Sequence, residues 1–523
     1  MENSTHANGS SNLGYTIFIA AVVSLGGFLF GFDAGIISGV MEYGGPQLNL
    51  DNGQISWVTS SPTLIATLSM LVAGRWSDNV GRKPVLLIVG FTYALSAILS
   101  AYATSYEMLY IARMIGGFAF GTALIVAPTY IAEISTPANR GKLVSIQQLN
   151  IVLGFFAAFL SNYYFNDLFK SGGSFLTDEN IWRWMLGIEA FPAILYFILL
   201  FFVPKSPRWL FGKNRNEEGA AVLQKLHGAA LAESETQGIL QSIAEDKNKE
   251  KVSIGELFKP ALRFILWIGI AIGILQQITG INAIYFYANS IFKQTGIGTE
   301  AAFFQGVLLS GTSVVFTLVA MYLIDRMGRR PLLIVGMAGI AASLLLCAYS
   351  FSNATYQLNQ EDVAGIELIS KIDLGAVVGK EYDNDVDFKN DLKEILGNQT
   401  FLKTEGDIMQ ASVTMNATLA LIGIMGFIAC FAFSLGPVMW VLLSEMYPNK
   451  IRGLAIGFIG FLNSFSSWVI AQIFPWELEN LGSATAFLIF GLIALVGFFI
   501  FLKVVPETKG RSLEELEKEL IRS

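Results

Sequence analysis

The chain is short of charged residues, of cysteine and of histidine. Charged residues make up 14 % of its 523 residues, whereas 53 % are hydrophobic and the mean hydropathy is +0.54. A soluble domain carries roughly 25 % charged residues. The hydrophobic residues come in blocks of about 20, the length that a helix needs to cross a hydrocarbon core. The composition therefore argues against a soluble protein and predicts an integral membrane protein.

Each scarce residue type also argues against a class of function. The two cysteines, Cys347 and Cys430, lie in apolar runs, which favours buried small side chains over a disulfide or a thiolate metal site. The two histidines, His6 and His227, lie outside the apolar runs, and no nucleophile, metal-ligand or phosphate-loop pattern accompanies them. We expect no enzyme activity, metal or cofactor, and a gradient rather than ATP as the energy source. The net charge of −7 does not indicate a nucleic-acid partner, because much of the acid lies in hydrophilic stretches such as 361–405.

The apolar runs predict an all-α membrane protein of about twelve helices. The predicted spans are 15–39, 55–75, 84–103, 107–131, 142–165, 182–203, 262–290, 300–324, 331–352, 412–440, 452–474 and 484–505.

Lysine and arginine in the short loops predict the orientation of the chain, because cytoplasmic loops carry an excess of them. The 40–54 and 104–107 loops contain neither residue. The central linker is rich in them, as are the loops 76–84, 132–142, 325–331 and 445–452. Both termini should therefore be cytoplasmic. The stretch 351–410 should be external, and its sequence indicates no function.

Three features of the first half recur in the same order in the second half, which indicates an internal repeat. They are DNVGRKP at 78–84 and DRMGRRP at 325–331, a glutamate seven residues before Arg-Gly at Glu133 and Glu445, and VPKS at 203–206 and VPET at 505–508. A six-helix unit used twice is typical of transporters that rock one half against the other. The predicted organisation is a first half at 1–203, a linker with short helices at 204–260, a second half at 261–506 with the insert 351–410, and a tail at 507–523.

At these loops the sequence resembles the sugar porter family of the major facilitator superfamily, over essentially the whole chain apart from 351–410. The loop signature of the superfamily is similar to GRWSDNVGRK at 74–83. Sugar-porter signatures are similar to PKSPRWL at 204–210, QQITGIN at 276–282, GPVMW at 436–440 and PETKG at 506–510. The resemblance implies the major facilitator superfamily fold and sugar transport.

The seventh span contains three amides that suit a sugar site: Gln276, Gln277 and Asn282. Amides both donate and accept, as sugar hydroxyls do, without net charge. Because an unsatisfied polar group facing lipid costs roughly 1 to 3 kcal/mol, they should face a cavity or a neighbouring helix. The alternative is that they only join helices. On an ideal helix Gln277 and Asn282 lie about 140° apart, so one face cannot present both unless the helix breaks, for which Gly280 is the candidate.

The resemblance extends this site beyond the seventh span. It implies sugar contacts from Gln148, Gln276, Gln277, Asn282 and Asn463, an apolar platform from Trp440, and an aromatic gate at Phe286 and Tyr287. The alternative for the aromatic residues is packing or anchoring at the membrane interface. Ser313 and Ser464 stand where many family members have Asn and Trp, which predicts a roomier or wetter pocket there.

Asp33 in the first span and Arg113 in the fourth are the candidates for proton coupling. An ionisable group within a span costs about 2.5 to 3.5 kcal/mol on the insertion scale and is a functional hypothesis by default. Burial disfavours the carboxylate and a nearby arginine favours it, so a change in their separation would change the proton affinity of Asp33. In the family, an acid at this position resembles that of proton symporters. The alternative is a static salt bridge between two helices.

The charged residues of the repeated loops resemble the family's cytoplasmic latch, which joins the halves when the cavity opens outward. They are Asp78, Arg82, Glu133, Arg140, Asp325, Arg329, Glu445 and Arg452. The alternative is that they serve membrane topology alone. Lys205 replaces a glutamate usual in the family, whereas Glu507 remains in the second half, so the latch should be either weaker or differently paired.

The leading hypothesis is a multi-pass protein of a bacterial inner membrane, monomeric in the lipid bilayer, that moves a monosaccharide, a hexose or a pentose, by symport with protons. A passive sugar facilitator with the same fold is the nearest alternative. A non-transporting sugar sensor is a further one, although the sequence lacks the long cytoplasmic tail that sensors typically carry.

Overall fold

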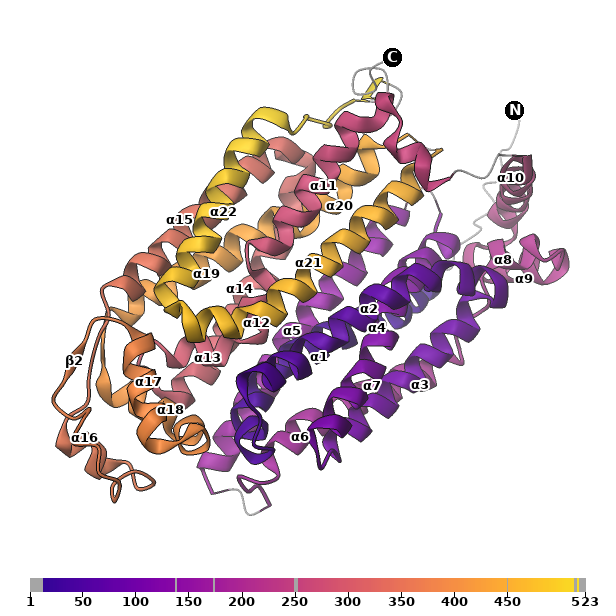
Figure 1. Ribbon diagram of the computed structural model, residues 1–523. Coiled ribbons are helices and arrows are strands. Elements are labelled where there is room, and N and C mark those ends of the chain that lie inside the picture. Colours follow the sequence, from indigo (N-terminus) through magenta and orange to yellow (C-terminus); the bar gives the residue numbers. More distant parts are fainter. Residues whose placement is uncertain are drawn as a thin grey trace, which may run out of the picture.

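A computed structural model gives the structure of the chain. It describes residues 13–136, 139–172, 175–248, 253–448, 450–511 and 515–516, and the side chains of 140, 230, 246–248 and 325 lie outside this description. Twelve helical spans in the described residues are long and apolar enough to cross a membrane, which confirms the predicted number. Figure 1 shows them as two bundles.

Six of these spans form the first half. Its helices are α1 Leu13–Gln47, α2 Asn52–Val80, α3 Arg82–Ala101, α4 Tyr106–Ile134, α5 Arg140–Lys170, and α6 Ile181–Gly187 with α7 Ala190–Leu200, which together form the sixth span. Glycines allow α1 and α5 to approach closely. A Cβ at Gly31 would lie 2.0 Å from the carbonyl oxygen of Ile151, and a Cβ at Gly154 would lie 2.1 Å from that of Phe28. Small residues at such crossings are the usual basis of helix packing in membranes.

The linker and the second half follow. The linker contains α8 Pro207–Gly212, α9 Asn216–His227, α10 Ala229–Asn248 and the 3₁₀ turns η1 Ile254–Phe258 and η2 Pro260–Leu262. The second half contains α11 Arg263–Ile278, α12 Ile281–Phe286, α13 Ala288–Lys293, α14 Gly298–Met327, α15 Arg329–Ser352, α19 Ala417–Phe433, α20 Leu435–Met446, α21 Arg452–Asn480 and α22 Gly482–Val504. The predicted continuous spans 262–290 and 412–440 are each broken, the second at Ser434.

Between α15 and α19 the chain forms a small folded unit, which we call the insert. It consists of β1 Thr355–Gln357, α16 Gln360–Gly365, β2 Glu381–Tyr382, α17 Asp385–Leu396, α18 Asn398–Ser412 and β3 Val413–Thr414. The strands form an antiparallel sheet in the order β2-β1-β3, with Tyr356 opposite both Tyr382 and Val413. The insert has a hydrophobic core of its own, with Tyr356, Phe388 and Leu392 among its members.

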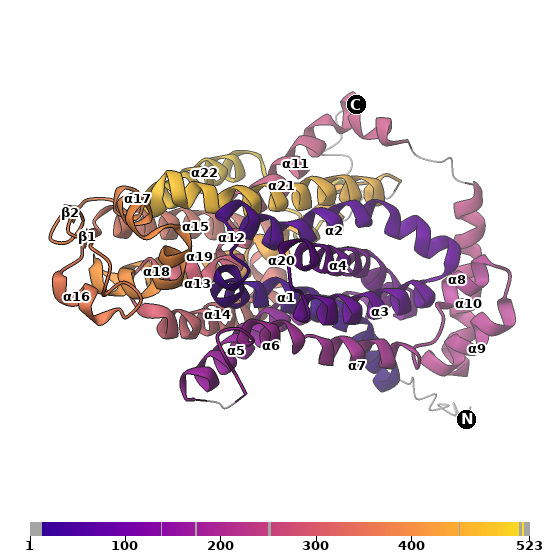
Figure 2. The ribbon, with the colours of Figure 1, turned by 60° about the horizontal axis from the view of Figure 1, so that its bottom comes forward.

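The linker and the insert lie at opposite ends of the bundle, as Figures 1 and 2 show. We call these the linker end and the insert end. Helix α1 begins at the linker end, where Thr16 Oγ1 donates to the carbonyl of Leu226. It runs to the insert end, where Glu42 pairs with Lys293 of the second half. The two halves meet along α2 against α21 and along α5 against α14.

Candidate functional site

Four amide side chains meet where α11, α12 and α21 come together. They are Gln276, Gln277, Asn282 and Asn463. The side-chain oxygen of Gln276 accepts from Asn463 Nδ2 at 2.7 Å and from Gln277 Nε2 at 3.2 Å. Gln277 Nε2 also donates to Asn463 Oδ1 at 3.2 Å, and Gln277 Oε1 accepts from Asn282 Nδ2 at 3.0 Å. The result is a chain of uncharged donors and acceptors, which we call the amide cluster.

A break in the seventh span allows Asn282 to join this cluster. Helix α11 ends at Ile278, Gly280 has φ +90°, and α12 begins at Ile281. This left-handed conformation favours glycine, and a Cβ at Gly280 would also lie 2.7 Å from the ring of Phe490. The break places Asn282 Nδ2 within 2.6 Å of Ser467 Oγ on α21. The prediction that Gly280 interrupts the helix is confirmed.

The structure does not bring Gln148 and Trp440 into hydrogen-bonded contact with the amide cluster. Gln148 is half-buried on α5 of the first half, and no hydrogen bond among the described residues joins it to the amides. Trp440 on α20 is 40 % exposed. Its indole lies 3.6 Å from the position that a Cβ on Gly460 of α21 would occupy. Trp440 and the amides thus share α21 as a neighbour.

The aromatic residues that follow Asn282 close against both halves. Tyr287 is buried, and its hydroxyl donates to the carbonyl of Ala471 on α21 at 3.0 Å. Phe286 is buried beside it. Tyr285, which the sequence reasoning did not single out, lies 4.5 Å from Phe155 of the first half between ring centroids. This residue, rather than Phe286 or Tyr287, makes the described aromatic contact with α5, and the three consecutive aromatics were the available signal.

Asp33 and Arg113 form a buried ion pair between α1 and α4. The guanidinium donates to both carboxylate oxygens, with Nη1 to Oδ1 at 3.2 Å and Nη2 to Oδ2 at 3.4 Å. Arg113 Nε also donates to the carbonyl of Val58 at 3.0 Å. Asp33 is 5 % exposed and Arg113 2 %. The predicted partnership is present, and its role in proton coupling remains a prediction.

Glu189 is a second buried carboxylate near this pair, and the sequence reasoning missed it. It lies at the joint between α6 and α7, is 4 % exposed and interacts electrostatically with Asp33 and Arg113. The first half therefore encloses two acids and one arginine in its core. A search for every ionisable residue within the predicted spans, rather than for motif positions alone, would have found Glu189 in the 182–203 run.

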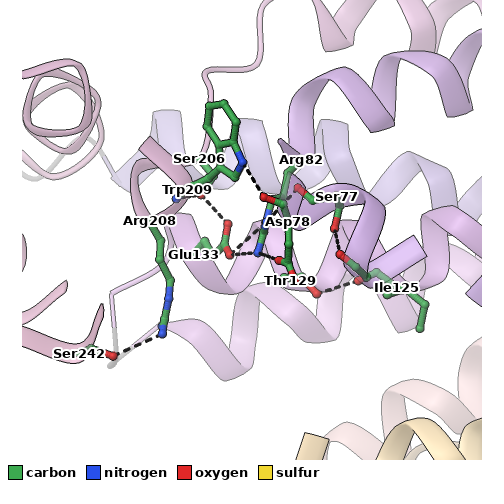
Figure 3. A network of polar contacts seen from close by, with 11 residues as sticks. Ser77, Asp78, Arg82, Ile125, Thr129, Glu133, Ser206, Arg208, Trp209 and Ser242 are labelled. Carbon is green, nitrogen blue, oxygen red and sulfur yellow. Dashed lines mark hydrogen bonds and ion pairs between the residues drawn. The ribbon is translucent and has the colours of Figure 1, made fainter. Parts of the chain in front are cut away.

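At the linker end of the first half, Arg82 organises a charge network (Figure 3). Its guanidinium contacts Asp78 at 2.7 Å, and it donates to Glu133 from Nη2 at 2.8 Å and from Nε at 3.1 Å. The other oxygen of Glu133 accepts from Ser206 Oγ at 2.5 Å, and Trp209 Nε1 donates to the carbonyl of Asp78 at 3.0 Å. The network ties the loop between α2 and α3 to α4 and to the start of the linker.

The second half contains the same arrangement. Arg329 Nη2 donates to Glu445 Oε1 at 2.9 Å, and Glu445 Oε2 accepts from Thr508 Oγ1 at 2.5 Å. We call Arg82-Glu133-Ser206 and Arg329-Glu445-Thr508 the linker-end triads. Glu507 differs from its counterpart Lys205, because its carboxylate accepts from the backbone N–H groups of Arg329 and Arg330.

The other predicted latch residues are Arg140, Asp325 and Arg452. Arg452 Nε donates to the carbonyl of Tyr447 at 3.1 Å. The side chains of Arg140 and Asp325 lie outside the described residues. The three ion pairs described for the latch residues, Arg82 with Asp78, Arg82 with Glu133 and Arg329 with Glu445, each stay within one half. In this conformation the described pairs therefore brace each half.

Most of the described polar contacts between the halves lie at the insert end, and the sequence reasoning missed them. Ser56 Oγ donates to the carbonyl of Gln472 at 2.5 Å, and Ser60 Oγ donates to Gln472 Oε1 at 2.6 Å. The N–H of Asn289 donates to Ser38 Oγ at 2.9 Å. The serines near the start of the second span were the available signal. The halves are closed together at the insert end.

Twelve apolar helices in two similar halves, with a neutral polar site and a buried ion pair inside the bundle, define a multi-pass membrane transport protein. The chain belongs to the sugar (and other) transporter family, whose model matches residues 19–375 and 395–520. The match includes both ends of the 351–410 region, which the sequence reasoning excluded from the resemblance. The stretch between the two matched ranges is shorter, 376–394.

Relatives and solved structures agree over nearly the whole chain. The chain is 31 % identical to the arabinose-proton symporter of Bacillus subtilis (strain 168), over 98 % of this chain and 97 % of the other. It is 32 % identical to the major myo-inositol transporter IolT of the same organism, over 96 % of this chain and 93 % of the other. Its fold is similar to the major facilitator superfamily proton:xylose symporter XylE bound to 6-bromo-6-deoxy-D-glucose, with 28 % identity, a TM-score of 0.70 and coverage of 97 % and 100 %. It is also similar to the inward-open conformation of the xylose transporter XylE from E. coli, with 27 % identity and a TM-score of 0.72. That match covers 97 % of this chain and 100 % of the other.

Proposed function

We propose that this protein is a secondary active transporter that moves a monosaccharide, a hexose or a pentose, across a bacterial inner membrane by alternating access, in symport with protons. The observation that carries the proposal is the pairing of a neutral amide cluster in the second half with a buried carboxylate-arginine pair in the first. The names of the relatives, an arabinose-proton symporter and sugar and inositol transporters, support the same activity. We propose no enzyme activity, and a monomer as the working unit.

The amide cluster supplies what sugar recognition requires. Each hydroxyl of a sugar both donates and accepts, and amide groups present both functions without the desolvation cost of a charge. Gln276, Gln277, Asn282 and Asn463 satisfy one another in this conformation. A sugar would replace some of these bonds with its own. Trp440 would pack against a C–H face of the ring, and Gln148 would reach the sugar from the first half.

The proton site is Asp33, with Arg113 as its partner and Glu189 beside it. In this conformation Arg113 neutralises Asp33 through two hydrogen bonds in a water-poor environment. A rearrangement that draws Arg113 away would leave an unpaired buried carboxylate, which takes up a proton rather than remain charged. Proton binding would thus be coupled to which end of the bundle is open.

The closed insert end and the positive-inside rule support one orientation of the protein in the membrane. Lysine and arginine concentrate in the loops at the linker end, so we place that end in the cytoplasm and the insert outside. With its insert end closed, the structure represents an inward-facing state. The linker-end triads would then join the halves only when the linker end closes.

Uptake of a labelled sugar panel into energised proteoliposomes, with and without a collapsed proton gradient, tests this function. Asp33→Asn should abolish accumulation against a gradient while sugar exchange persists, because exchange needs the sugar site but no net proton movement. If the variant still concentrates sugar, the proton role of Asp33 is wrong. The facilitator alternative predicts that sugar addition causes no proton flux in the unmodified protein.

A further inference from the structure

The insert places a charged side chain beside the ion pair that joins the two halves at the insert end. Lys293 of α13 contacts Glu42 of α1 at 2.9 Å, and only 6 % and 14 % of these side chains are exposed. Helix α18 of the insert packs on the lysine, because a Cβ at Gly406 would lie 3.2 Å from Lys293 Cδ. Glu405 immediately precedes Gly406 on the same helix and interacts electrostatically with Lys293. One buried lysine therefore lies between Glu42 of the first half and the acidic residues of the insert, Glu405 and, more weakly, Asp407.

Glu405 is held in place by the second half and the insert. Gln294 Nε2 donates to Glu405 Oε1 at 2.9 Å, and Lys389 Nζ lies 4.0 Å from the same oxygen. Burial by itself would raise the pKa of Glu405, but Lys293, Lys389 and the Gln294 amide hold it below its ordinary value. The carboxylate is therefore charged at neutral pH.

The insert is fastened to the second half and should move with it. Both ends of the insert join second-half helices, α15 and α19. Asp385 accepts from the N–H of Ser483 at 3.1 Å and from its hydroxyl at 2.9 Å, at the start of α22. Lys393 contacts Glu479 at the end of α21 at 2.6 Å. Figure 2 shows α17 beside α22 and α18 beside α13.

Because the insert moves with the second half, Glu405 should favour separation of the halves rather than their closure. When the halves separate at the insert end, Glu42 leaves with the first half, while Lys293 and Glu405 stay together on the second. A buried lysine that lost its only partner would cost several kcal/mol, but Glu405 remains as a second partner. In the closed state Glu405 also repels Glu42. Both effects favour opening.

We propose that the insert controls the closure of the two halves at the insert end, which we call the insert-end gate. As the halves separate, Glu405 of the insert replaces Glu42 as the ion-pair partner of Lys293. The proposal rests on the proposed function only in that the halves separate at this end during transport. It assigns opposite roles to two carboxylates on one lysine. Glu42 stabilises the closed gate, and Glu405 lowers the cost of opening it.

Accessibility of a cysteine beneath the gate tests the proposal. Ser56 is 2 % exposed and bonded to Gln472 across the two halves, so a Ser56→Cys thiol reacts only when the gate opens. The background carries Cys347→Ala and Cys430→Ala. Its alkylation by N-ethylmaleimide, which crosses membranes, is followed by mass spectrometry in proteoliposomes without sugar or a proton gradient. A failure of proton coupling would therefore leave these rates unchanged.

The two carboxylates should give opposite results. Glu42→Gln should raise the alkylation rate about two- to fivefold, and Glu405→Gln should lower it by a similar factor, a modest range because Lys293 keeps one carboxylate partner in either variant. Glu394→Gln, which removes an exposed charge from the same insert, is the matched control and should leave the rate unchanged. A rate raised or unchanged by Glu405→Gln would overturn the proposal.

A charge swap gives a second test, in which Glu405→Gln should have the opposite effect on the alkylation rate. In Glu42→Lys with Lys293→Glu, the ion pair between the halves is restored, but Glu405 now attracts the residue at position 42. Glu405→Gln should then raise the alkylation rate instead of lowering it. If its effect has the same sign in both backgrounds, Glu405 acts only through the packing of the insert. Should the loss of charge unfold the insert, Glu405→Asp, which keeps the charge but shortens the reach, should lower the rate in the unmodified background.

Discussion

The two halves of this protein are nearly the same at the linker end and different in their interiors. At the linker end each half has an arginine, a glutamate and a hydroxyl in one arrangement, with Arg82-Glu133 at 2.8 Å and Arg329-Glu445 at 2.9 Å. Inside the bundle the first half encloses the Asp33-Arg113 pair, whereas the second encloses uncharged amides. Duplication has preserved the parts that brace each half, and the interiors have diverged where the proposed proton site and sugar site need different groups.

The buried charge of the first half should give the largest effect on stability. Arg113→Leu leaves Asp33 and Glu189 without the arginine, which should destabilise the protein by about 3 to 5 kcal/mol. Adding Asp33→Asn should recover more than half of the lost thermal stability, because one of the unpaired acids is removed. Thermal melting in detergent measures both. If the double variant melts no higher than Arg113→Leu, the pair is not the source of the loss.

A substitution in the amide cluster of the second half should weaken the binding of sugar. Asn463→Leu removes the partner of Gln276 and Gln277, so the dissociation constant for sugar should rise about 10- to 100-fold, as for the loss of one or two hydrogen bonds. Proton binding at Asp33 should stay unchanged. Equilibrium binding by calorimetry measures the effect, with Ser466→Ala on the same helix as the control. An unchanged affinity would mean that the amides only join helices.

The two linker-end triads should differ only by their burial. The Glu133 side chain is 7 % exposed and that of Glu445 is 23 % exposed. We expect Glu133→Gln to cost about 1 to 2 kcal/mol and Glu445→Gln about 0.5 to 1 kcal/mol. Melting temperatures relative to an exposed control, Glu217→Gln, test the order. The reverse order would break the proposed equivalence of the two halves.

The smallest effect should come from His227, which attaches the linker to the first half. Its Nδ1 lies 2.5 Å from Glu235 Oε2 and its Nε2 lies 2.9 Å from the carbonyl of Ile134. Burial alone would lower the pKa of His227, but the Glu235 carboxylate and the Ile134 carbonyl raise it above its ordinary value of 6.5. The stabilisation is therefore complete below about pH 6.5 and is lost as the pH rises through the raised value.

A pH series of melting temperatures tests this contribution. The unmodified protein should lose about 1 to 2 °C more than His227→Gln between pH 6 and pH 9. Equal slopes for the two proteins would show that the imidazole does not bind an extra proton on folding.

Much of the fold was readable because hydrophobic runs and repeated loops are local patterns. The number of spans follows from run length, and the equivalence of Arg82 with Arg329 follows from the two DxxGR[KR]P loops. The break at Gly280 was predicted from the spacing of Gln277 and Asn282. The partnership of Asp33 with Arg113 was predicted because a buried charge needs a partner and few are available inside the spans.

Other features depend on contacts between distant segments and could not be read in this way. The sequence of the 351–410 region did not indicate a folded unit, because its small core uses scattered residues such as Tyr356, Phe388 and Ile408. Tyr285 was passed over for its two neighbours because nothing local says which of three aromatics faces α5. Glu189 was passed over because it lies within an apolar run, and only the fold brings it near Asp33.

By itself the sequence determined the twelve spans, their duplication, the amides of the seventh span and the buried acid of the first, because length, periodicity and the cost of polar groups in lipid act locally. Only the tertiary structure decided that the insert end is closed, that the linker-end triads brace each half, and that Glu405 shares Lys293 with Glu42. Those outcomes depend on how two rigid halves and an insert meet, and the energies involved arise between residues more than one hundred positions apart.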